Sequence, residues 1–268
     1  GDFLDLVLGG VGHETEVGTV QTLLRLASQV IDPYGDPARA KERGQRMAVR
    51  LFELVDASQA GSDLQLAFVR AAAIAAVDDA QLARVAAILS GDELIDGLAV
   101  DTELRWLLLH RLVATRRADE QAIDDELARD DTSAGHRHAL TLRAARPTAE
   151  AKAEAWRAVV DQGELPNADQ AATIAGFVSF EQRDLLAPYL DRYFASIGEI
   201  YRSRSHEMAD QIVTGLYPMW VTDPSTIDCT EAYLRDEQPG PALRRSLTES
   251  RDALARALRA RDFDVANS

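Results

Sequence analysis

Helical spacing of apolar side chains is the feature that most constrains this sequence. The segment from Val17 to Ile31 has an apolar residue at every third or fourth position, and Asp32-Pro33-Tyr34-Gly35 then ends the run. The segment from Leu104 to Val113 is apolar nearly all round, so we expect a central, buried helix there. No segment alternates apolar and polar residues in the way of a half-buried strand.

These segments indicate an all-α fold. Roughly a dozen helices with short connections predict an irregular superhelix of antiparallel helix pairs, similar to HEAT or armadillo proteins. The sequence shows no fixed period of about 34 or about 40 residues, which disfavours a regular repeat protein.

Several helix starts can be predicted from their capping residues. Asp36 is an N-cap before Pro37, whose missing N–H costs nothing at the first helical position. Ser62 and Gln65 have the spacing of a capping box, in which each side chain satisfies one backbone N–H. The segment from Asn167 to Gln170 predicts a similar start.

Charge and cysteine content narrow the function classes. The chain has 29 lysines and arginines against 44 aspartates and glutamates, a net charge of −15 at pH 7. Such a surface repels phosphate backbones and anionic lipid, so we expect neither nucleic acid nor a membrane among the partners. The single cysteine, Cys229, leaves no internal disulfide, and we expect it to be a semi-buried helical residue of a cytoplasmic protein.

The first residues indicate a domain cut from a longer protein. Gly1-Asp2-Phe3-Leu4-Asp5 lacks the basic region of a signal peptide and begins within a helical pattern. A chain of 268 residues can bury a sizeable core. We therefore expect residues 1–268 to form a single helical domain whose first helix is truncated.

Two histidine-containing segments partly match a zinc-binding sequence motif. Zinc peptidases of the thermolysin type need H-E-x-x-H on a helix, because two histidines four positions apart share a face and hold the ion. His13-Glu14 is followed by Val17 at the position of the second ligand, and His206-Glu207 is followed by Asp210. We interpret both as chance partial matches.

Two further patterns also fall short of a metal site. His136 and His138 would lie about 200° apart around a helix and could not share one ion. The acidic run from Asp124 to Asp131 has Ala128 where a D-D-x-x-D magnesium motif needs its last carboxylate, which favours a solvated helix end. We therefore predict no catalytic residue and no metal ligand in this chain.

Short stretches spread over nearly the whole chain carry a family resemblance. They are VLGGVGHE at 7–14, ELRW at 103–106, ELARDDTSAG at 126–135, AARP at 144–147, AKAEAW at 151–156, ELPN at 164–167, AGF at 175–177, LAPY at 186–189, HEMA at 206–209, GLYP at 215–218 and PALRR at 241–245. In their order and spacing they resemble the C-terminal helical domain of actinobacterial aminopeptidase N-type zinc metallopeptidases, which belong to the gluzincin aminopeptidases. Endoplasmic-reticulum aminopeptidases have the same class of domain.

The resemblance implies a division of labour within a longer protein. In that family a preceding domain holds zinc through H-E-x-x-H and a distant glutamate, and it removes amino-terminal residues from peptides with a metal-activated water. The helical domain packs over the catalytic domain, closes the substrate chamber and tunes peptide length and specificity. The resemblance therefore implies that this chain is a non-catalytic cap, inactive alone, whose partners are the parent's own catalytic domain and peptide substrates.

Four residues are candidates for peptide contact. Arg202, Arg204 and His206 place two cations and a histidine within one short segment, and Arg105 adjoins Trp106. Each could meet a peptide carboxylate or backbone group. Ordinary surface arginines in ion pairs along a helix are the simpler interpretation of the same residues.

A stand-alone helical scaffold is the alternative function. Such a protein would bind a peptide or protein partner in a concave groove and would share the fold of the cap. The segment upstream of residue 1 discriminates between the two, because H-E-x-x-H in the same reading frame favours the peptidase. An independent enzyme is a third interpretation, which the missing catalytic motif disfavours.

Overall fold

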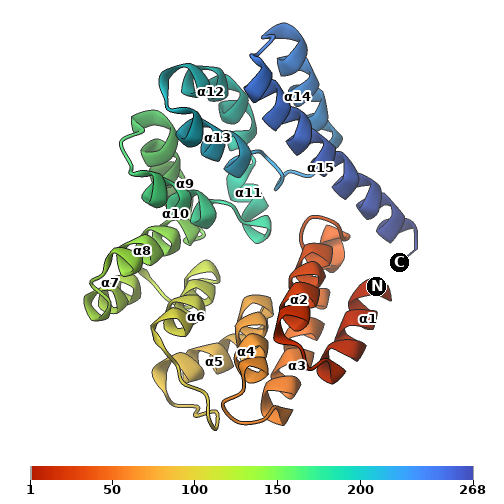
Figure 1. The fold of residues 1–268 in the computed structure, drawn as a ribbon, viewed down its shortest axis with the longest axis vertical. Coiled ribbons are helices and arrows are strands. Elements are labelled where there is room, and N and C mark those ends of the chain that lie inside the picture. Colours follow the sequence, from red (N-terminus) through yellow and green to blue (C-terminus); the bar gives the residue numbers. More distant parts are fainter. Residues whose placement is uncertain (1, 268) are drawn as a thin grey trace. The chain divides into compact units, whose positions relative to one another are not determined.

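The predicted all-α fold is confirmed by a computed structural model, which describes residues 2–267 (Figure 1). Within these residues there are fifteen α-helices and no strand. No helix in this range is both long and apolar enough to cross a membrane. In chain order the helices are α1 Asp2–Gly10, α2 Val17–Ile31, α3 Ala40–Ala57, α4 Asp63–Ala75, α5 Asp79–Ser90, α6 Thr102–Ala114, α7 Glu120–Arg129, α8 Ser133–Ala145, α9 Ala149–Trp156, α10 Asn167–Phe177, α11 Arg183–Leu186, α12 Tyr189–Ser203, α13 His206–Gly215, α14 Pro224–Asp236 and α15 Pro241–Ala266.

The helices form two compact units, each with its own hydrophobic core. The first unit comprises the chain up to Ala122 together with the residues from Asp262 onward, and the second comprises Ile123–Arg261. Both boundaries fall inside helices, one in α7 and one in α15. We expected residues 1–268 to form a single domain. The division into two compact units does not test whether these units act as one domain, so this expectation stays a prediction.

The first unit is built around helices that are close in sequence. Helix α3 packs against α4, and both α4 and α5 pack against α6. Helix α6 occupies the segment predicted to be buried, and its Leu104, Leu108 and Leu112 belong to the core of this unit. Burial on several faces of α6 follows from its nearly continuous apolar sequence.

The second unit has an aromatic cluster at its centre. Helix α8 packs closely against α10, and α12 packs against α13. Trp156 lies 5.0 Å from Tyr189 between ring centroids, and Phe177 contacts both Tyr189 and Trp220 edge-on at 5.0 and 5.8 Å. After Trp156 the backbone of α9 continues as a π-helix, Arg157–Gln162. Such wide turns are rare and often occur at functional positions.

Two of the predicted local features are confirmed, and the third, the capping box at Ser62, forms only the first of its two bonds. The Asp36 carboxylate accepts a hydrogen bond from the Ala38 backbone N–H, in a short 3-10 turn that precedes α3. The Ser62 hydroxyl accepts the Gln65 backbone N–H, and the Gln65 side chain accepts the N–H of Gly61. Cys229 is partly buried in α14.

The predicted cap at Asn167 is wrong. Pro166 occupies the N-cap position of α10 and makes no side-chain capping bond. The Asn167 amide donates to Glu207, and the Gln170 amide donates to the Met208 carbonyl at 3.1 Å and to Gln211 at 2.6 Å. These side chains therefore bind α13 instead of their own backbone, because tertiary partners compete with local capping.

Candidate functional site

Two of the predicted peptide-contact residues lie exposed at the junction of α12 and α13. Arg202 is in the last turn of α12, where its side chain is 72% exposed and pairs with Glu199 at 2.9 Å. His206 begins α13, and its Nδ1 lies 3.1 Å from the hydroxyl of the half-buried Tyr201. The junction presents a cation and an imidazole, both of which can bind peptide carbonyl or carboxylate groups.

Arg204 sits between these two residues but has a different environment. Its guanidinium donates to the carbonyls of Val159 and Val160 in the π-helix. Burial lowers the pKa of Arg204, and the charge of Asp161 partly opposes this shift. Arg204 therefore satisfies carbonyls at a helix end that lack partners in their own helix.

Gly163 makes room for the Arg204 guanidinium. Its φ of +68° is a left-handed conformation that side chains rarely adopt. A Cβ at this position would also lie 2.5 Å from Nη2 of Arg204. The glycine thus permits both the turn that ends the π-helix and the close approach of Arg204.

Arg105 belongs to the first unit, whereas the other three candidates belong to the second. It lies on α6, where its Nη1 donates to the Leu89 carbonyl at 3.1 Å, in the last turn of α5. A cation at the C-terminus of a helix is favourable for that helix. Arg202, Arg204 and His206 thus lie within one segment at the α12–α13 junction but contact different partners, whereas Arg105 contacts a helix end.

The partial zinc motifs do not assemble a metal site. Within residues 2–267 no group of three or more histidine, cysteine, aspartate or glutamate side chains is placed to hold an ion. The Asp210 carboxylate accepts a hydrogen bond from Ser246 at 2.7 Å, and the His206 ring contacts Tyr201. A tetrahedral zinc ion needs at least three protein ligands, so the residues described in this chain do not fit zinc.

Lys152 is a buried cation that the sequence pattern did not single out. Its side chain is fully buried, and Nζ donates to the carbonyls of Ala144 at 2.8 Å, Gly176 at 3.3 Å and Phe177 at 3.0 Å. These carbonyls lie at the ends of α8 and α10. Burial lowers the pKa of Lys152 to about 7. The Lys152 side chain therefore joins the ends of α8 and α10. This contact could not be predicted from the sequence, because Lys152 lies in a polar, alanine-rich segment that is typical of an exposed helix.

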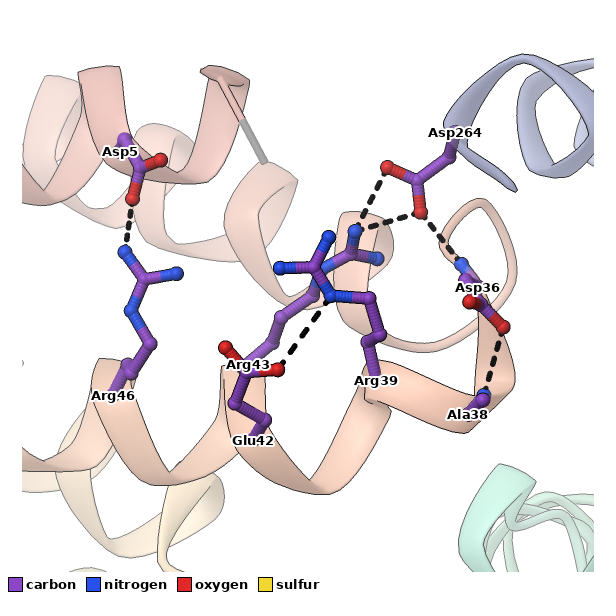
Figure 2. Close-up of polar contacts among 8 residues, drawn as sticks. All are labelled: Asp5, Asp36, Ala38, Arg39, Glu42, Arg43, Arg46 and Asp264. Atoms are coloured by element: carbon purple, nitrogen blue, oxygen red, sulfur yellow. Dashed lines mark hydrogen bonds and ion pairs between the residues drawn. The ribbon is translucent and has the colours of Figure 1, made fainter. Parts of the chain in front are cut away.

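Two arginines one turn apart on α3 join neighbouring elements of the first unit, as Figure 2 shows. Arg46 pairs with Asp5 of α1. Arg43 is fully buried and pairs with Asp264 of α15 at 2.7 Å, and the Asp36 backbone N–H donates to the same carboxylate at 2.8 Å.

The pKa of Asp264 reflects these contacts. Burial alone raises it, but the Asp36 N–H and the Arg43 guanidinium together hold it below its ordinary value. The carboxylate is thus kept charged, and it holds the last turn of α15 against the start of α3.

Comparisons with known proteins agree with the resemblance in the sequence. The ERAP1-like C-terminal domain family matches residues 1–256. Aminopeptidase N of Streptomyces lividans is 48% identical over 265 residues, which cover 99% of this chain but 31% of that protein. The chain therefore spans about a third of the length of this relative. The match covers both compact units, and the chain belongs to the ERAP1-like C-terminal domain family.

Proposed function

We propose that this chain is the non-catalytic C-terminal cap of a zinc aminopeptidase that removes amino-terminal residues from peptides. The observation that carries the proposal is the 48% identity to an aminopeptidase N, extending over 99% of this chain but 31% of the relative. A similarity that covers nearly all of this chain but only about a third of the relative supports the proposal that this chain is one part of a larger enzyme. We refer below to the polypeptide that contains this chain and its preceding segment as the longer protein.

The cap would act on substrates through shape and contact. Zinc held in the preceding domain would supply the activated water, while this chain would limit which peptides reach it. The family match to residues 1–256 supports our proposal that both units work as one domain. The free thiol of Cys229 agrees with the cytoplasmic location that we infer.

Arg202 and His206 are the residues that we propose to contact the peptide beyond the scissile bond. Both side chains are exposed at the α12–α13 junction, where a peptide can reach them. The guanidinium groups of Arg204 and Arg105 already bind backbone carbonyls, so their substitution would disturb helix ends as well as any peptide contact. Contacts made only by longer peptides favour those peptides without changing the reaction of short ones.

Substitution of the exposed pair should change the preference for peptide length. In the longer protein, we expect Arg202→Ala and His206→Ala to lower kcat/KM for peptides of eight or more residues by roughly two- to fivefold, the loss of one exposed charged contact. Hydrolysis of an aminoacyl fluorophore should be unchanged, because our proposal places the contact with α12 beyond the scissile bond, where this substrate has no further residues. A peptide-length series measured with each variant tests this.

Arg245→Ala is the matched control. Arg245 is 79% exposed and pairs with Glu249 on α15, much as Arg202 pairs with Glu199. We expect this variant to keep the wild-type length preference. An unchanged length preference in the Arg202 and His206 variants would contradict the proposed contact.

A further inference from the structure

Arg204 and Ser205 form the connection between α12 and α13, and the proposed peptide contacts lie on either side of it. Arg202 is in the last turn of α12, and His206 is the first residue of α13. Two local bonds shape this turn. Ser205 accepts a backbone N–H from the first turn of α13 at 3.3 Å, and the Tyr201 hydroxyl lies 3.1 Å from Nδ1 of His206. Because the partners in both bonds are neighbours in sequence, neither bond fixes the turn against another part of the second unit.

Arg204 is the residue of this connection that reaches a distant element. Its guanidinium donates to the carbonyls of Val159 and Val160, which are 45 and 44 positions away in the sequence. Both valines are buried, and they lie in the last turn of the π-helix, where carbonyls lack N–H partners in their own helix. Unpaired buried carbonyls are costly, so the π-helix favours a conformation in which Arg204 keeps the end of α12 beside it.

Arg192 makes a weaker tie between α12 and the π-helix. It lies near the start of α12, where it pairs with Asp161 at 3.6 Å, and the two side chains are 47% and 50% exposed. Its guanidinium also lies 5.1 Å from the ring centroid of Trp156. An exposed ion pair contributes little, whereas the two carbonyl bonds of Arg204 are partly buried. Of these polar contacts, Arg204 therefore makes the one that holds the end of α12, which carries Arg202.

The beginning of α13 is held separately, by α10. The Asn167 amide donates to Glu207, and the Gln170 amide donates to a carbonyl of the same turn of α13. The position of His206 thus follows from α10, whereas the position of Arg202 follows from the end of α12. The spacing between the two proposed contacts depends on how both helix ends are held.

We propose that Arg204 is a positioning residue, which holds the end of α12 against the π-helix and so sets the spacing between Arg202 and His206 for a bound peptide. The inference rests on the proposed function. Arg204 would not touch the peptide, because its guanidinium faces the π-helix carbonyls. A peptide gains from two contacts at once only when their spacing fits it. Loss of the anchor should therefore weaken the binding of long peptides in the same way as loss of the contacts.

The length preference of the longer protein measures this effect. We define it as the ratio of kcat/KM for a long peptide to kcat/KM for an aminoacyl fluorophore. Arg204→Ala should lower this ratio by roughly two- to fivefold, as we expect for loss of a contact itself. Arg204→Lys should keep most of the wild-type ratio, because an ammonium group can bind several helix-end carbonyls, as that of Lys152 does.

Gly163→Ala tests the anchor without changing Arg204. The new Cβ would lie 2.5 Å from Nη2 and displace the guanidinium, so the ratio should fall as it does in Arg204→Ala. Arg244→Ala is the matched control. Arg244 donates to the Leu234 carbonyl at 3.2 Å, in the last turn of α14, a helix end that is not part of the junction. This variant should keep the wild-type ratio.

A variant cycle separates positioning from an independent effect of Arg204. If Arg204 acts through Arg202 and His206, the variant Arg202→Ala/His206→Ala should lose no further length preference when Arg204→Ala is added. Additive losses would overturn the proposal, because Arg204 would then act without these two residues.

Hydrogen exchange in the longer protein tests the anchor without a substrate. Arg204→Ala should raise the exchange rates of residues 157–163 and 201–208 together, by about threefold or more, because both lose the same contact. The rest of α12 should stay folded, since Tyr193, Ile197 and Ile200 lie in the core of the second unit. Equal exchange in Arg204→Ala and wild type would overturn the anchor.

The two measurements together distinguish failure of this inference from failure of the proposed function. Faster exchange with an unchanged length preference in Arg204→Ala would overturn the positioning role. The proposed function would then be judged by the variant Arg202→Ala/His206→Ala. A lower ratio in that variant would leave the proposed peptide contact standing, and an unchanged ratio would overturn the contact as well.

Discussion

Gly176→Ala is expected to destabilise the second unit by about 3 kcal/mol or more. Gly176 lies in α10 where this helix crosses α8, and a Cβ there would be 1.9 Å from the Thr141 carbonyl oxygen and 3.0 Å from the Cβ of Ala144. The carbonyl belongs to the backbone of α8 and cannot rotate away, so the two helices must separate. Separation would also disturb the bond from Lys152 to the Gly176 carbonyl.

Chemical denaturation measures this loss. Fluorescence of Trp156 and Trp220, which lie in the core of the second unit, contributes to the unfolding signal of that unit. Gly9→Ala is the matched control, because a Cβ at Gly9 has no atom within 4 Å and an exposed helical glycine costs about 0.5–1 kcal/mol relative to alanine. The control should be neutral or slightly stabilising. A Gly176→Ala variant as stable as the wild type would mean that α8 and α10 do not approach so closely.

Lys152→Met is expected to remove a pH dependence of stability. The folded-state pKa of Lys152 is about 7, below its ordinary value of 10.5. Below pH 7 both states are protonated and the cost of the buried charge is fully present. Between pH 7 and 10.5 the unfolded chain binds more protons than the folded chain, so the free energy of unfolding rises by about 1.4 kcal/mol per pH unit.

The useful window for this measurement is pH 6 to 9.5. Burial raises the pKa of Tyr217 to about 12, which reverses the trend above pH 10 because the folded state then retains the extra proton. The stability advantage of wild type over Lys152→Met should therefore be about 2–3 kcal/mol larger at pH 9 than at pH 6. At pH 9 the neutral amine of Lys152 still has two N–H donors, so the variant should be the less stable protein, since it leaves the buried carbonyls of Ala144, Gly176 and Phe177 without these donors.

Lys41→Met provides the control for Lys152. Lys41 is exposed on α3, so its substitution should leave the pH dependence of the wild type in place. Urea denaturation at each pH gives the free energies of unfolding. Parallel pH curves for wild type and Lys152→Met would show that Lys152 stays protonated in the folded chain, with its three carbonyl contacts outweighing burial.

The fold was predictable where local signals and packing agree. Helix α2 has the predicted bounds, Val17–Ile31, because apolar spacing and the Asp32–Gly35 turn point to the same end. The sequence at Asn167 also resembled a capping box. In the structure, however, the side chains of Asn167 and Gln170 bind residues of α13 instead. Such competition depends on residues about forty positions away, which a local pattern does not contain.

The candidate site was predictable only in part. The short segment at 202–206 lies at the α12–α13 junction, where the peptide contact by its residues stays a prediction. It could not distinguish the exposed Arg202 from Arg204, because the difference lies in the carbonyls of the distant π-helix. Lys152 was missed for the same reason, since its partners are helix ends brought together by tertiary packing.

We propose that this chain contributes shape and contact to a peptidase but no chemistry. The most direct test of this claim compares hydrolysis of an aminoacyl fluorophore, with zinc supplied, by this chain and by the longer protein. We expect turnover by the longer protein and none by this chain, whose described residues form no metal site. Activity in neither would favour a helical scaffold, and turnover by this chain alone would contradict the claim and direct attention to His13, His206 and Asp210.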